Sequence, residues 1–222
     1  MRLPQGPERK QEGNKRMENR RIVLASASPR RKELMNQIGL DPDIVVSHVK
    51  EQVTSSVPSQ VVMELASQKA EDVAGNQDPG TFVIGADTVV AAEGIILGKP
   101  SDHQEARRML GILEGKKHQV YTGVCVIRCG EPGTPGQKSL FFDEADVEVA
   151  HMSEAEMEEY AGMEEPMDKA GGYGIQGFFA RYIKGITGSY ANVMGLPVHL
   201  VYQELKKLGF WEEENRSGKE SR

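Results

Sequence analysis

Two adjacent arginines follow an apolar run near residue 22, and their type and position could bind phosphate. The run 22–25 leads directly into Ser26-Ala27-Ser28-Pro29-Arg30-Arg31. Proline suits the first position of a helix and the serine before it suits the N-cap, so a helix is predicted to begin here. A helix N-terminus attracts anions, and two guanidiniums add bidentate hydrogen-bonding forks. We therefore predict a phosphate site. The alternative is that the arginines are solvated or paired with distant carboxylates.

A carboxylate interrupts an apolar run in the middle of the chain, where acid–base or metal chemistry could take place. Asp87 and Thr88 lie between the strand-like runs 81–86 and 89–92. Burying an unpaired carboxylate costs several kcal/mol, so Asp87 requires a metal, a cation or a cleft open to water. The alternative is a cap or a turn, which the strand patterns on both sides do not favour. We predict a functional role for Asp87.

Three further charged residues are candidates because of their positions. Glu51 follows a predicted strand at 44–46, and ligands gather at that end of the strands in open α/β folds. It is a candidate metal ligand or base. Lys69 lies on an amphipathic helix predicted at 58–74, and Lys99 lies in a Gly-Lys-Pro turn. A solvated side chain is the alternative for Glu51 and Lys69.

A glycine-rich stretch at 165–177 has little propensity for helix or strand, with four glycines within residues 171–177. Disorder is the alternative, but Tyr173, Ile175 and the pair Phe178-Phe179 would be poorly solvated in a mobile linker. We predict an ordered binding loop.

Predicted strands and helices must position these residues. Ser101 with Gln104 and Ser153 with Glu156 are predicted capping boxes at two helix starts. Strands are predicted at 22–25, 44–46, 81–92, 95–97, 119–128, 140–150 and 178–183, and helices at 30–38, 58–74, from Ser101 to 113, 153–160 and 198–208.

Length and composition exclude several classes of protein. The 222 residues suffice for one large domain or two lobes, and a net charge of −6 with a pI near 5.5 argues against a specific nucleic-acid partner. Cys125 and Cys129 are too few for a disulfide framework. No apolar run has the roughly 18 residues that a membrane span needs. We expect a cytoplasmic protein without a membrane partner.

The two ends of the chain differ from its middle. Residues 1–20 are predicted to be a disordered basic leader, because the first 21 residues carry seven Arg/Lys against three Glu and show no apolar periodicity. Residues 21–209 are expected to form the folded domain. Residues 210–222 are expected to be a charged tail.

Six motifs occur in order along roughly residues 21–208. They are Ser26-Ala-Ser-Pro-Arg-Arg31, Gly85-Ala-Asp-Thr-Val-Val90, Gly98-Lys-Pro100, Tyr121-Thr-Gly123, Asp168-Lys-Ala-Gly-Gly-Tyr-Gly-Ile-Gln-Gly177 and Gly188-Ser-Tyr-Ala-Asn-Val-Met-Gly-Leu-Pro197. Together they resemble the Maf family of nucleoside triphosphate pyrophosphatases. The basic leader and a Gly/Pro-rich insertion between two strands depart from the family pattern without touching a motif.

The resemblance implies a fold and an activity. The fold is α/β, similar to the inosine triphosphatase-like proteins, with an elongated mixed central sheet flanked by helices and two lobes with a cleft. The activity is hydrolysis of a nucleoside triphosphate between the α and β phosphates with a divalent metal cation, Mg²⁺ or Mn²⁺. Family members commonly look like dimers, so a homodimer is expected. We expect a stand-alone version of the domain that also resembles the N-terminal half of the acetylserotonin methyltransferase-like protein.

The resemblance also implies roles for individual residues. The general base of the family falls on Asp87, and the specificity positions of the branch that acts on dTTP and UTP fall on Arg30, Thr88 and Gln176. Glu51 is a candidate to share a metal with Asp87. The implied substrate-binding residues are Ser26, Ser28, Arg31, Lys69, Lys99 and Lys169.

Three alternatives stay open. The first is a nucleotide-binding regulator of cell division without significant turnover. The second is a nucleic-acid-associated protein that uses residues 1–21 and the arginine pair. The third is a pyrophosphatase whose substrates are modified pyrimidine triphosphates.

Overall fold

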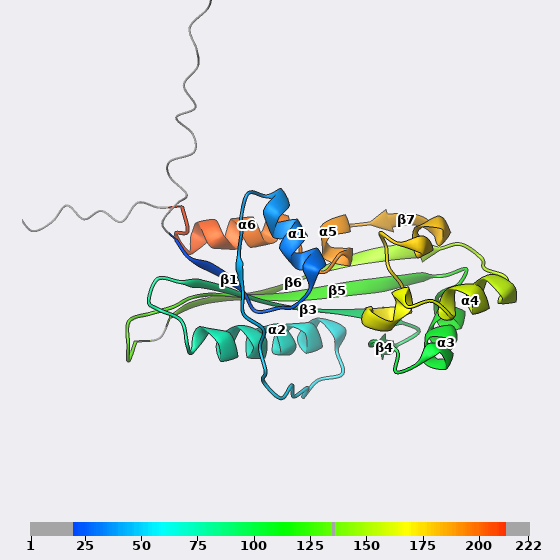
Figure 1. Ribbon diagram of the computed structural model, residues 1–222, viewed down its shortest axis with the longest axis horizontal. Helices are drawn as coiled ribbons and strands as arrows, with labels where there is room; N and C mark the ends of the chain where they lie inside the picture. Colours follow the sequence, from blue (N-terminus) through cyan, green and yellow to red (C-terminus); the bar gives the residue numbers. More distant parts are fainter. Residues whose placement is uncertain (1–19, 135, 212–222) are drawn as a thin grey trace, which may run out of the picture.

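The computed structural model describes residues 20–134 and 136–211. Its strands form one seven-stranded sheet in the order β2-β1-β3-β5-β6-β7, with β4 paired to β3 (Figure 1). Among these strands, β1 pairs in parallel with both β2 and β3, and the other pairs are antiparallel. The predicted mixed sheet is confirmed. The strands are β1 (Ile22–Leu24), β2 (Asp43–Ile44), β3 (Phe82–Ala92), β4 (Ile95–Leu97), β5 (Lys117–Arg128), β6 (Gln137–Val149) and β7 (Ile183–Thr187).

Helices flank both faces of the sheet and cover one end of it. Three short 3-10 segments, η1 to η3, replace regular helix or strand between residues 165 and 182. The helices and 3-10 segments are α1 (Pro29–Gln37), α2 (Pro58–Ala74), α3 (His103–Leu113), α4 (Glu154–Ala161), η1 (Glu165–Asp168), η2 (Ala170–Gly172), η3 (Phe178–Tyr182), α5 (Tyr190–Val193) and α6 (Val198–Lys207).

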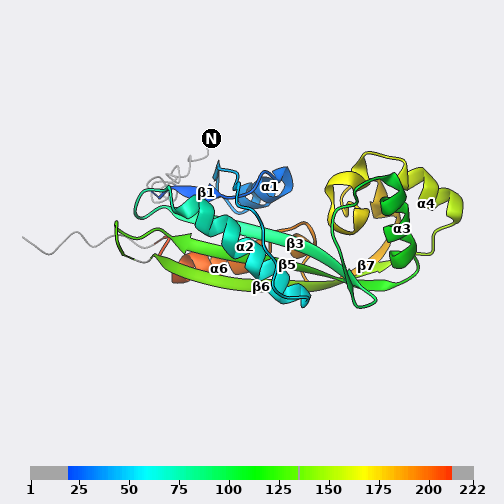
Figure 2. The same cartoon turned by 90° about the horizontal axis from the view of Figure 1, so that it is seen from below.

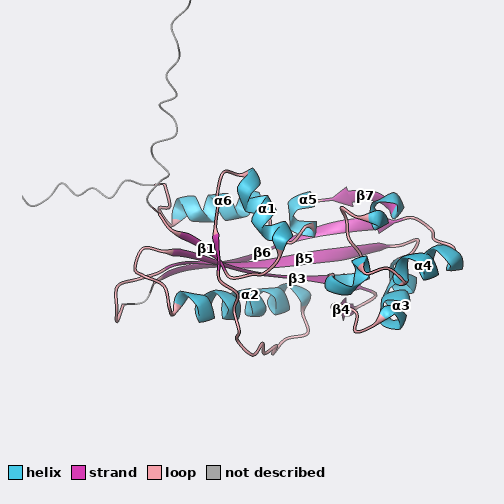
Figure 3. Cartoon of the chain, in the orientation of Figure 1, coloured by secondary structure: helices cyan, strands magenta, loops and turns pink. Residues whose placement is uncertain are grey.

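Three long strands connect the two lobes of the molecule. β3, β5 and β6 run along its length, with α1, α2 and α6 around one end and α3 and α4 around the other (Figures 1 and 2). Figure 3 shows this sheet in magenta between the cyan helices. The predicted elongated two-lobed shape is therefore confirmed. Within the described ranges 20–134 and 136–211, no helix is long and apolar enough to cross a membrane.

The first lobe has three layers because successive side chains of β3 point to opposite faces of the sheet. Val83 packs against α2 on one face. Phe82 and Ile84 pack with residues of α1 and α6 on the other face, beside Phe210. The Phe210 and Phe82 ring centroids are 5.0 Å apart, and Trp211 also packs against this core, so packed residues continue beyond the predicted boundary at 209. Of the predicted leader 1–20 and tail 210–222, only residues 20, 210 and 211 are among the described residues, and the rest lie outside them.

The second lobe has its own apolar core, built on the far ends of β3, β5 and β6. It contains the predicted inner face of α3, namely Ala106, Met109, Leu110 and Leu113. Tyr160 of α4 packs beside the glycine-rich segment, with its ring centroid 4.9 Å from that of Phe179. The cores of the two lobes thus pack on opposite ends of the same strands.

The edge of β3 that faces β1 is interrupted, and this creates an opening in the sheet. β3 pairs with β1 through residues 82–84 and with β4 through residues 90–92, while its other edge pairs with β5. In the described part of the chain, residues 85–89 therefore have no strand beside them on that edge. Asp87 and Thr88 lie in this interval, and their side chains reach opposite faces of the sheet.

Two glycines let α2 lie directly on the sheet. A Cβ atom at Gly85 of β3 would lie 2.3 Å from the Ala66 carbonyl oxygen, and one at Gly123 of β5 would lie 2.3 Å from the Val62 carbonyl oxygen. Any other residue would push the helix away, because both contacts are with helix backbone. This close approach brings Lys69 of α2 within reach of Asp87.

Replacing Gly123 is therefore expected to destabilise the fold. Gly123→Ala should lower the free energy of unfolding by about 1–3 kcal/mol, because the added methyl group overlaps the α2 backbone. Urea denaturation measures the change. Gly185→Ala is the matched control, because Gly185 also lies in a strand and a Cβ atom there meets nothing within 4 Å. Equal stability of the two variants would contradict the close packing of α2.

Two predicted elements are corrected by the structure. The N-cap of α3 is Asp102, whose carboxylate accepts a hydrogen bond from the Glu105 amide at 2.7 Å, so the predicted Ser101–Gln104 capping box is wrong by one residue. Aspartate caps as well as serine does, which leaves the register open in the sequence. The predicted strand 178–183 is also wrong, because 178–182 is the 3-10 segment η3 and β7 begins at Ile183.

Candidate active site

A cleft of about 1000 Å³ lies at the interruption of the sheet edge, between the two lobes. Its walls come from the β1–α1 turn, the 46–51 segment, α2, the middle of β3, the turn after β4 and the glycine-rich segment. Every candidate residue from the sequence lines it. These residues are Ser26, Ser28, Arg30, Arg31, Glu51, Lys69, Asp87, Thr88, Lys99, Lys169 and Gln176.

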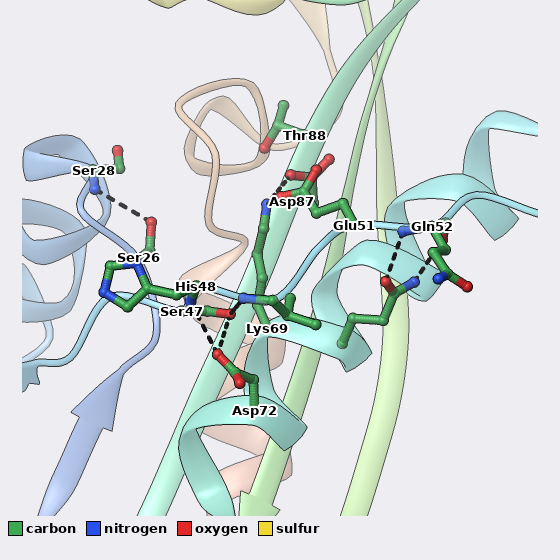
Figure 4. A network of polar contacts seen from close by, with 12 residues as sticks. Ser26, Ser28, Ser47, His48, Glu51, Gln52, Lys69, Asp72, Asp87 and Thr88 are labelled. Atoms are coloured by element: carbon green, nitrogen blue, oxygen red, sulfur yellow. Dashed lines mark hydrogen bonds and ion pairs between the residues drawn. The ribbon is translucent and has the colours of Figure 1, made fainter.

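A lysine and two carboxylates meet on one face of β3. The Lys69 ammonium lies 2.6 Å from Asp87 Oδ1 and 3.0 Å from Glu51 Oε1 (Figure 4). The side chains of Lys69 and Asp87 are mostly buried, with exposed fractions of 18% and 17%, whereas Glu51 is about half exposed. Lys69 therefore supplies the cation that the partly buried Asp87 requires, and the cleft keeps the carboxylate accessible.

Glu51 reaches this cluster because its loop is tied to α2. The Asp72 carboxylate accepts hydrogen bonds from the Ser47 hydroxyl at 2.7 Å and the His48 amide at 3.0 Å (Figure 4). The Gln52 amide donates to the Gln68 side chain at 2.9 Å. These contacts on both sides of Glu51 hold the loop against the helix that carries Lys69.

The carboxylates of Asp87 and Glu51 are the residues that could hold a divalent metal. Both lie within hydrogen-bonding distance of the same lysine nitrogen, so their oxygens are close to one point. Among the described residues, no group of three or more His, Cys, Asp or Glu side chains could hold a metal ion. Two carboxylates fit Mg²⁺ or Mn²⁺ nonetheless, because such ions commonly bind one or two carboxylates together with substrate phosphates and water.

Arg31 lies on the other face of β3, where its guanidinium donates to three neutral oxygens. The acceptors are the Gly195 carbonyl at 2.8 Å, the Ser26 hydroxyl at 3.0 Å and the Thr88 hydroxyl at 3.1 Å. Burial lowers the pKa of Arg31 below its ordinary value, and Asp87 partly opposes this shift. A guanidinium held by neutral groups at the wall of a cleft retains N–H donors for an anion.

The hydroxyl of Thr88 belongs to a chain of hydrogen bonds that crosses the sheet. It lies 2.9 Å from the Thr122 hydroxyl, which donates to the Asn192 carbonyl at 2.8 Å. The Asn192 side-chain amide in turn donates to the Val120 carbonyl at 2.9 Å. This chain fixes both Thr88 and the α5 region that carries the carbonyl bonded to Arg31.

Arg30 points across the cleft to the glycine-rich segment. Its guanidinium lies 3.3 Å from the Asp168 carboxylate, which also pairs with Lys169. Although burial alone would raise it, the contacts with Lys169 and Arg30 leave the pKa of Asp168 below its ordinary value. An anion bound in the cleft would compete with Asp168 for Arg30 and Lys169.

The glycine-rich segment is ordered and closes the far wall of the cleft. The Gly171 amide donates to the Gly98 carbonyl at 2.9 Å, which joins the segment to the turn that carries Lys99. Gln176 is exposed and lies within the turn that the Gly177 amide closes on the Gly174 carbonyl at 3.2 Å. The prediction of an ordered loop is confirmed, and its location in the cleft agrees with a binding role.

Tyr173 anchors this segment to β5. Its hydroxyl lies 2.7 Å from Nε2 of the buried His118, and the two rings meet edge to face with centroids 5.3 Å apart. Burial lowers the pKa of His118 to about 4, so the imidazole is neutral near pH 7. The segment is thus tied to the sheet by a buried polar contact as well as by apolar packing.

The structure adds to the predicted site and corrects one detail. Ser28 occupies the predicted N-cap position of α1, but its side chain makes no capping hydrogen bond. Sequence reasoning assigned no role to Asp168, which pairs with two cleft cations, or to Glu165, whose carboxylate lies inside the glycine-rich segment. Both acidic residues lie shortly before the glycines in the same stretch, and this position was a signal that could have identified them.

Several known proteins are similar to this chain. The family model described as Maf-like protein matches residues 21–208. A dTTP/UTP pyrophosphatase of Agathobacter rectalis is 50% identical over 202 residues, with 85% of this chain and 97% of that protein covered. Proteins of the same name from Lachnoclostridium phytofermentans and Bacillus cereus are 44% and 45% identical, and each alignment covers 85% of this chain and 95% of the relative. The solved structure of the Staphylococcus aureus Ham1 protein overlaps 59% of this chain and 72% of its own, with 18% identity and a TM-score of 0.42.

Proposed function

The chain belongs to the Maf family, and from this premise we propose that it hydrolyses dTTP and UTP to the monophosphate and pyrophosphate. The observation that carries the proposal is the convergence of all predicted site residues on one cleft. The names of relatives at 44–50% identity that are aligned over nearly their whole length support the same substrates.

The phosphates are proposed to lie between the β1–α1 turn and the lysines. Arg31 offers N–H groups at one wall, and Lys99 is exposed at the cleft beyond β4. Arg30 and Lys169 would exchange part of their contact with Asp168 for phosphate oxygens. Because phosphoryl transfer needs little covalent chemistry from the protein, positioning and charge neutralisation by these cations provide much of the catalysis.

Asp87 is proposed to be the general base. Its Oδ1 atom accepts a hydrogen bond from Lys69, which orients the carboxylate while its other oxygen can accept a proton from water. The water oxygen bonds to the α-phosphorus, the bond from that phosphorus to the α–β bridging oxygen breaks, and pyrophosphate leaves. The Lys69 ammonium, on a helix packed directly on the sheet, fixes the direction of the carboxylate.

A divalent metal is part of the proposal. Asp87 and Glu51 would hold Mg²⁺ or Mn²⁺, whose chemistry is to neutralise phosphate charge and to make water more acidic. Lys69 contacts the same two carboxylates, so it competes with any other cation for them. The metal is expected to bind more tightly with nucleotide than alone, because two carboxylates leave most of its coordination sphere to phosphate and water.

Gln176 is proposed to read the pyrimidine edge. A primary amide carries one acceptor and two donor hydrogens, so it can pair with adjacent donor and acceptor groups on a base. Gln176 lies at the exposed side of an ordered turn, where its side chain can reach a base in the cleft. A purine would clash with this wall or leave the amide unpaired.

Product formation from a panel of nucleotides tests the proposal. We expect pyrophosphate release from dTTP and UTP to exceed that from dATP and 7-methyl-GTP by at least about tenfold in kcat/KM, which corresponds to about 1.4 kcal/mol of discrimination. Comparable rates on all four nucleotides would contradict the specificity. Binding of dTTP without product would instead select the regulator, and faster turnover of modified pyrimidine triphosphates would identify those as the substrates.

Chelation provides the control for this assay. Excess EDTA should abolish release, and Mg²⁺ or Mn²⁺ should restore it in the same sample. Activity that survives complete chelation would remove the metal from the proposal. The homodimer and the cytoplasmic location stay predictions that rest on the family resemblance and on composition.

A further inference from the structure

The carboxylate of Glu165 connects the start of the glycine-rich segment to the residues that follow it and to α4. It accepts hydrogen bonds from the Phe178 amide at 2.8 Å, the Phe179 amide at 3.4 Å and the Tyr160 hydroxyl at 3.0 Å. The Tyr160 hydroxyl also accepts a bond from the Gly174 amide at 3.1 Å. One side chain at the start of the segment therefore holds its middle and its end.

Two glycines of the turn, Gly174 and Gly177, lie very close to the Glu165 side chain. A Cβ atom at Gly177 would lie 2.2 Å from Glu165 Oε1, and one at Gly174 would lie 2.9 Å from the same oxygen. Gln176 is located between these two glycines. The backbone on each side of Gln176 thus lies close to the Glu165 carboxylate, and a larger residue at either position would displace that side chain or Lys169.

These contacts leave Glu165 little capacity for substrate or metal. A carboxylate has about four acceptor sites, and three are occupied by donors of the protein itself. Burial raises the pKa of Tyr160, so its hydroxyl keeps the proton that it donates to Glu165. Glu165 therefore acts on the turn that carries Gln176, although it lines the same cleft.

We propose that Glu165 is a positioning residue for base discrimination, because its carboxylate holds the turn that presents Gln176 to the cleft. The proposal rests on the proposed function, since discrimination is measured between nucleoside triphosphates. It assigns specificity to a residue whose carboxylate is occupied by donors of the protein itself and which holds the turn around Gln176.

The first test compares Glu165→Gln with Glu164→Gln. The control removes the same charge from the adjacent exposed residue. Glu165→Gln replaces one acceptor oxygen by a donor, so the ratio of kcat/KM for dTTP to that for dATP should fall about tenfold, as expected for the loss of a hydrogen bond to a charged group. Partial unfolding would lower both values equally and leave the ratio unchanged. An unchanged ratio in Glu165→Gln would overturn the proposal.

A double variant tests whether the effect passes through Gln176. If Glu165 acts by holding that turn, Glu165→Gln combined with Gln176→Ala should discriminate no worse than Gln176→Ala alone. If the losses of discrimination in the two single variants were additive in the double variant, Glu165 would not act through Gln176.

Amide hydrogen exchange provides a readout that does not depend on nucleotide turnover. In Glu165→Gln, the amides of Gly174 and Phe178 should exchange about tenfold faster than in the wild type, because each depends on the Glu165 network. Amides of the β3–β5 ladder should not change. Unchanged protection of both amides would overturn the positioning role. A wild type that hydrolyses no nucleoside triphosphate would overturn the proposed function and the link to discrimination, while exchange would still decide whether Glu165 holds the turn.

Discussion

Asp87→Asn should lower kcat for pyrophosphate release from dTTP by about 10²–10⁴-fold, the usual contribution of a general base. The change keeps the shape of the side chain and removes its ability to take a proton from water. It also replaces one of the two candidate carboxylate ligands of the metal by a weaker, neutral carbonyl ligand. A rate measurement under saturating nucleotide and Mn²⁺ separates this effect on chemistry from weaker binding.

The fold should survive this substitution. Lys69 keeps the Glu51 carboxylate at 3.0 Å, so its ammonium is not left without a negative partner. Asp78→Asn is the matched control, because Asp78 is exposed and does not line the cleft. Thermal unfolding of both variants should resemble that of the wild type. Unaltered kinetics in Asp87→Asn would exclude Asp87 as the base.

Arg31→Met should produce the second large effect, a loss of about 10²–10⁴-fold in kcat/KM for dTTP. Charge-assisted hydrogen bonds contribute about 1.5–3 kcal/mol each, and a guanidinium can make two of them with one phosphate. Methionine keeps much of the apolar stem and removes every donor. Steady-state kinetics over a wide range of nucleotide concentrations measures the change, which we expect largely in KM.

Lys32→Met is the control for this variant. Lys32 is the next residue of α1 and does not line the cleft. Its substitution by methionine also removes one positive charge. Its kcat/KM should stay within about twofold of the wild type, because Lys32 does not line the cleft and solvent ions screen a partly exposed charge. Equal losses in the two variants would indicate a general effect of charge and would contradict a specific role for Arg31.

The sequence predicted the regular elements well where local pattern and tertiary packing agree. α2 has the predicted bounds because its apolar stripe, at helical spacing, is the face that packs on β3 and β5. β3 combines apolar runs on both sides of Asp87, which a strand passing through two lobe cores requires. The capping box of Ser153 and Glu156 is present because it needs only contacts within one turn.

The predictions are wrong where contacts between residues far apart in the sequence determine the local structure. Residues 178–182 have strand-like composition, but the Phe178 and Phe179 amides bond to Glu165 and so do not join a strand ladder. Local pattern could not reveal this, because the acceptor lies thirteen or more residues away in the chain. The role of Glu165 was missed for the same reason.

The candidate site was predictable as a set of residues, but its arrangement was not. The apolar runs around Asp87 and the predicted helix start at Arg30 and Arg31 marked these residues as candidates, and all three line the cleft. The sequence did not indicate that Arg31 and Arg30 have different surroundings. In the structure Arg31 is fixed by three neutral oxygens, whereas Arg30 reaches across the cleft to a carboxylate.

A crystal structure of the protein with a non-hydrolysable dTTP analogue and Mn²⁺ is the most direct test of the central claim. We predict that the triphosphate contacts Arg31 and Lys99, that the α-phosphorus lies next to Asp87, and that the pyrimidine edge pairs with Gln176. A nucleotide bound outside this cleft, or one whose phosphates lie far from both Arg31 and Asp87, would contradict the account.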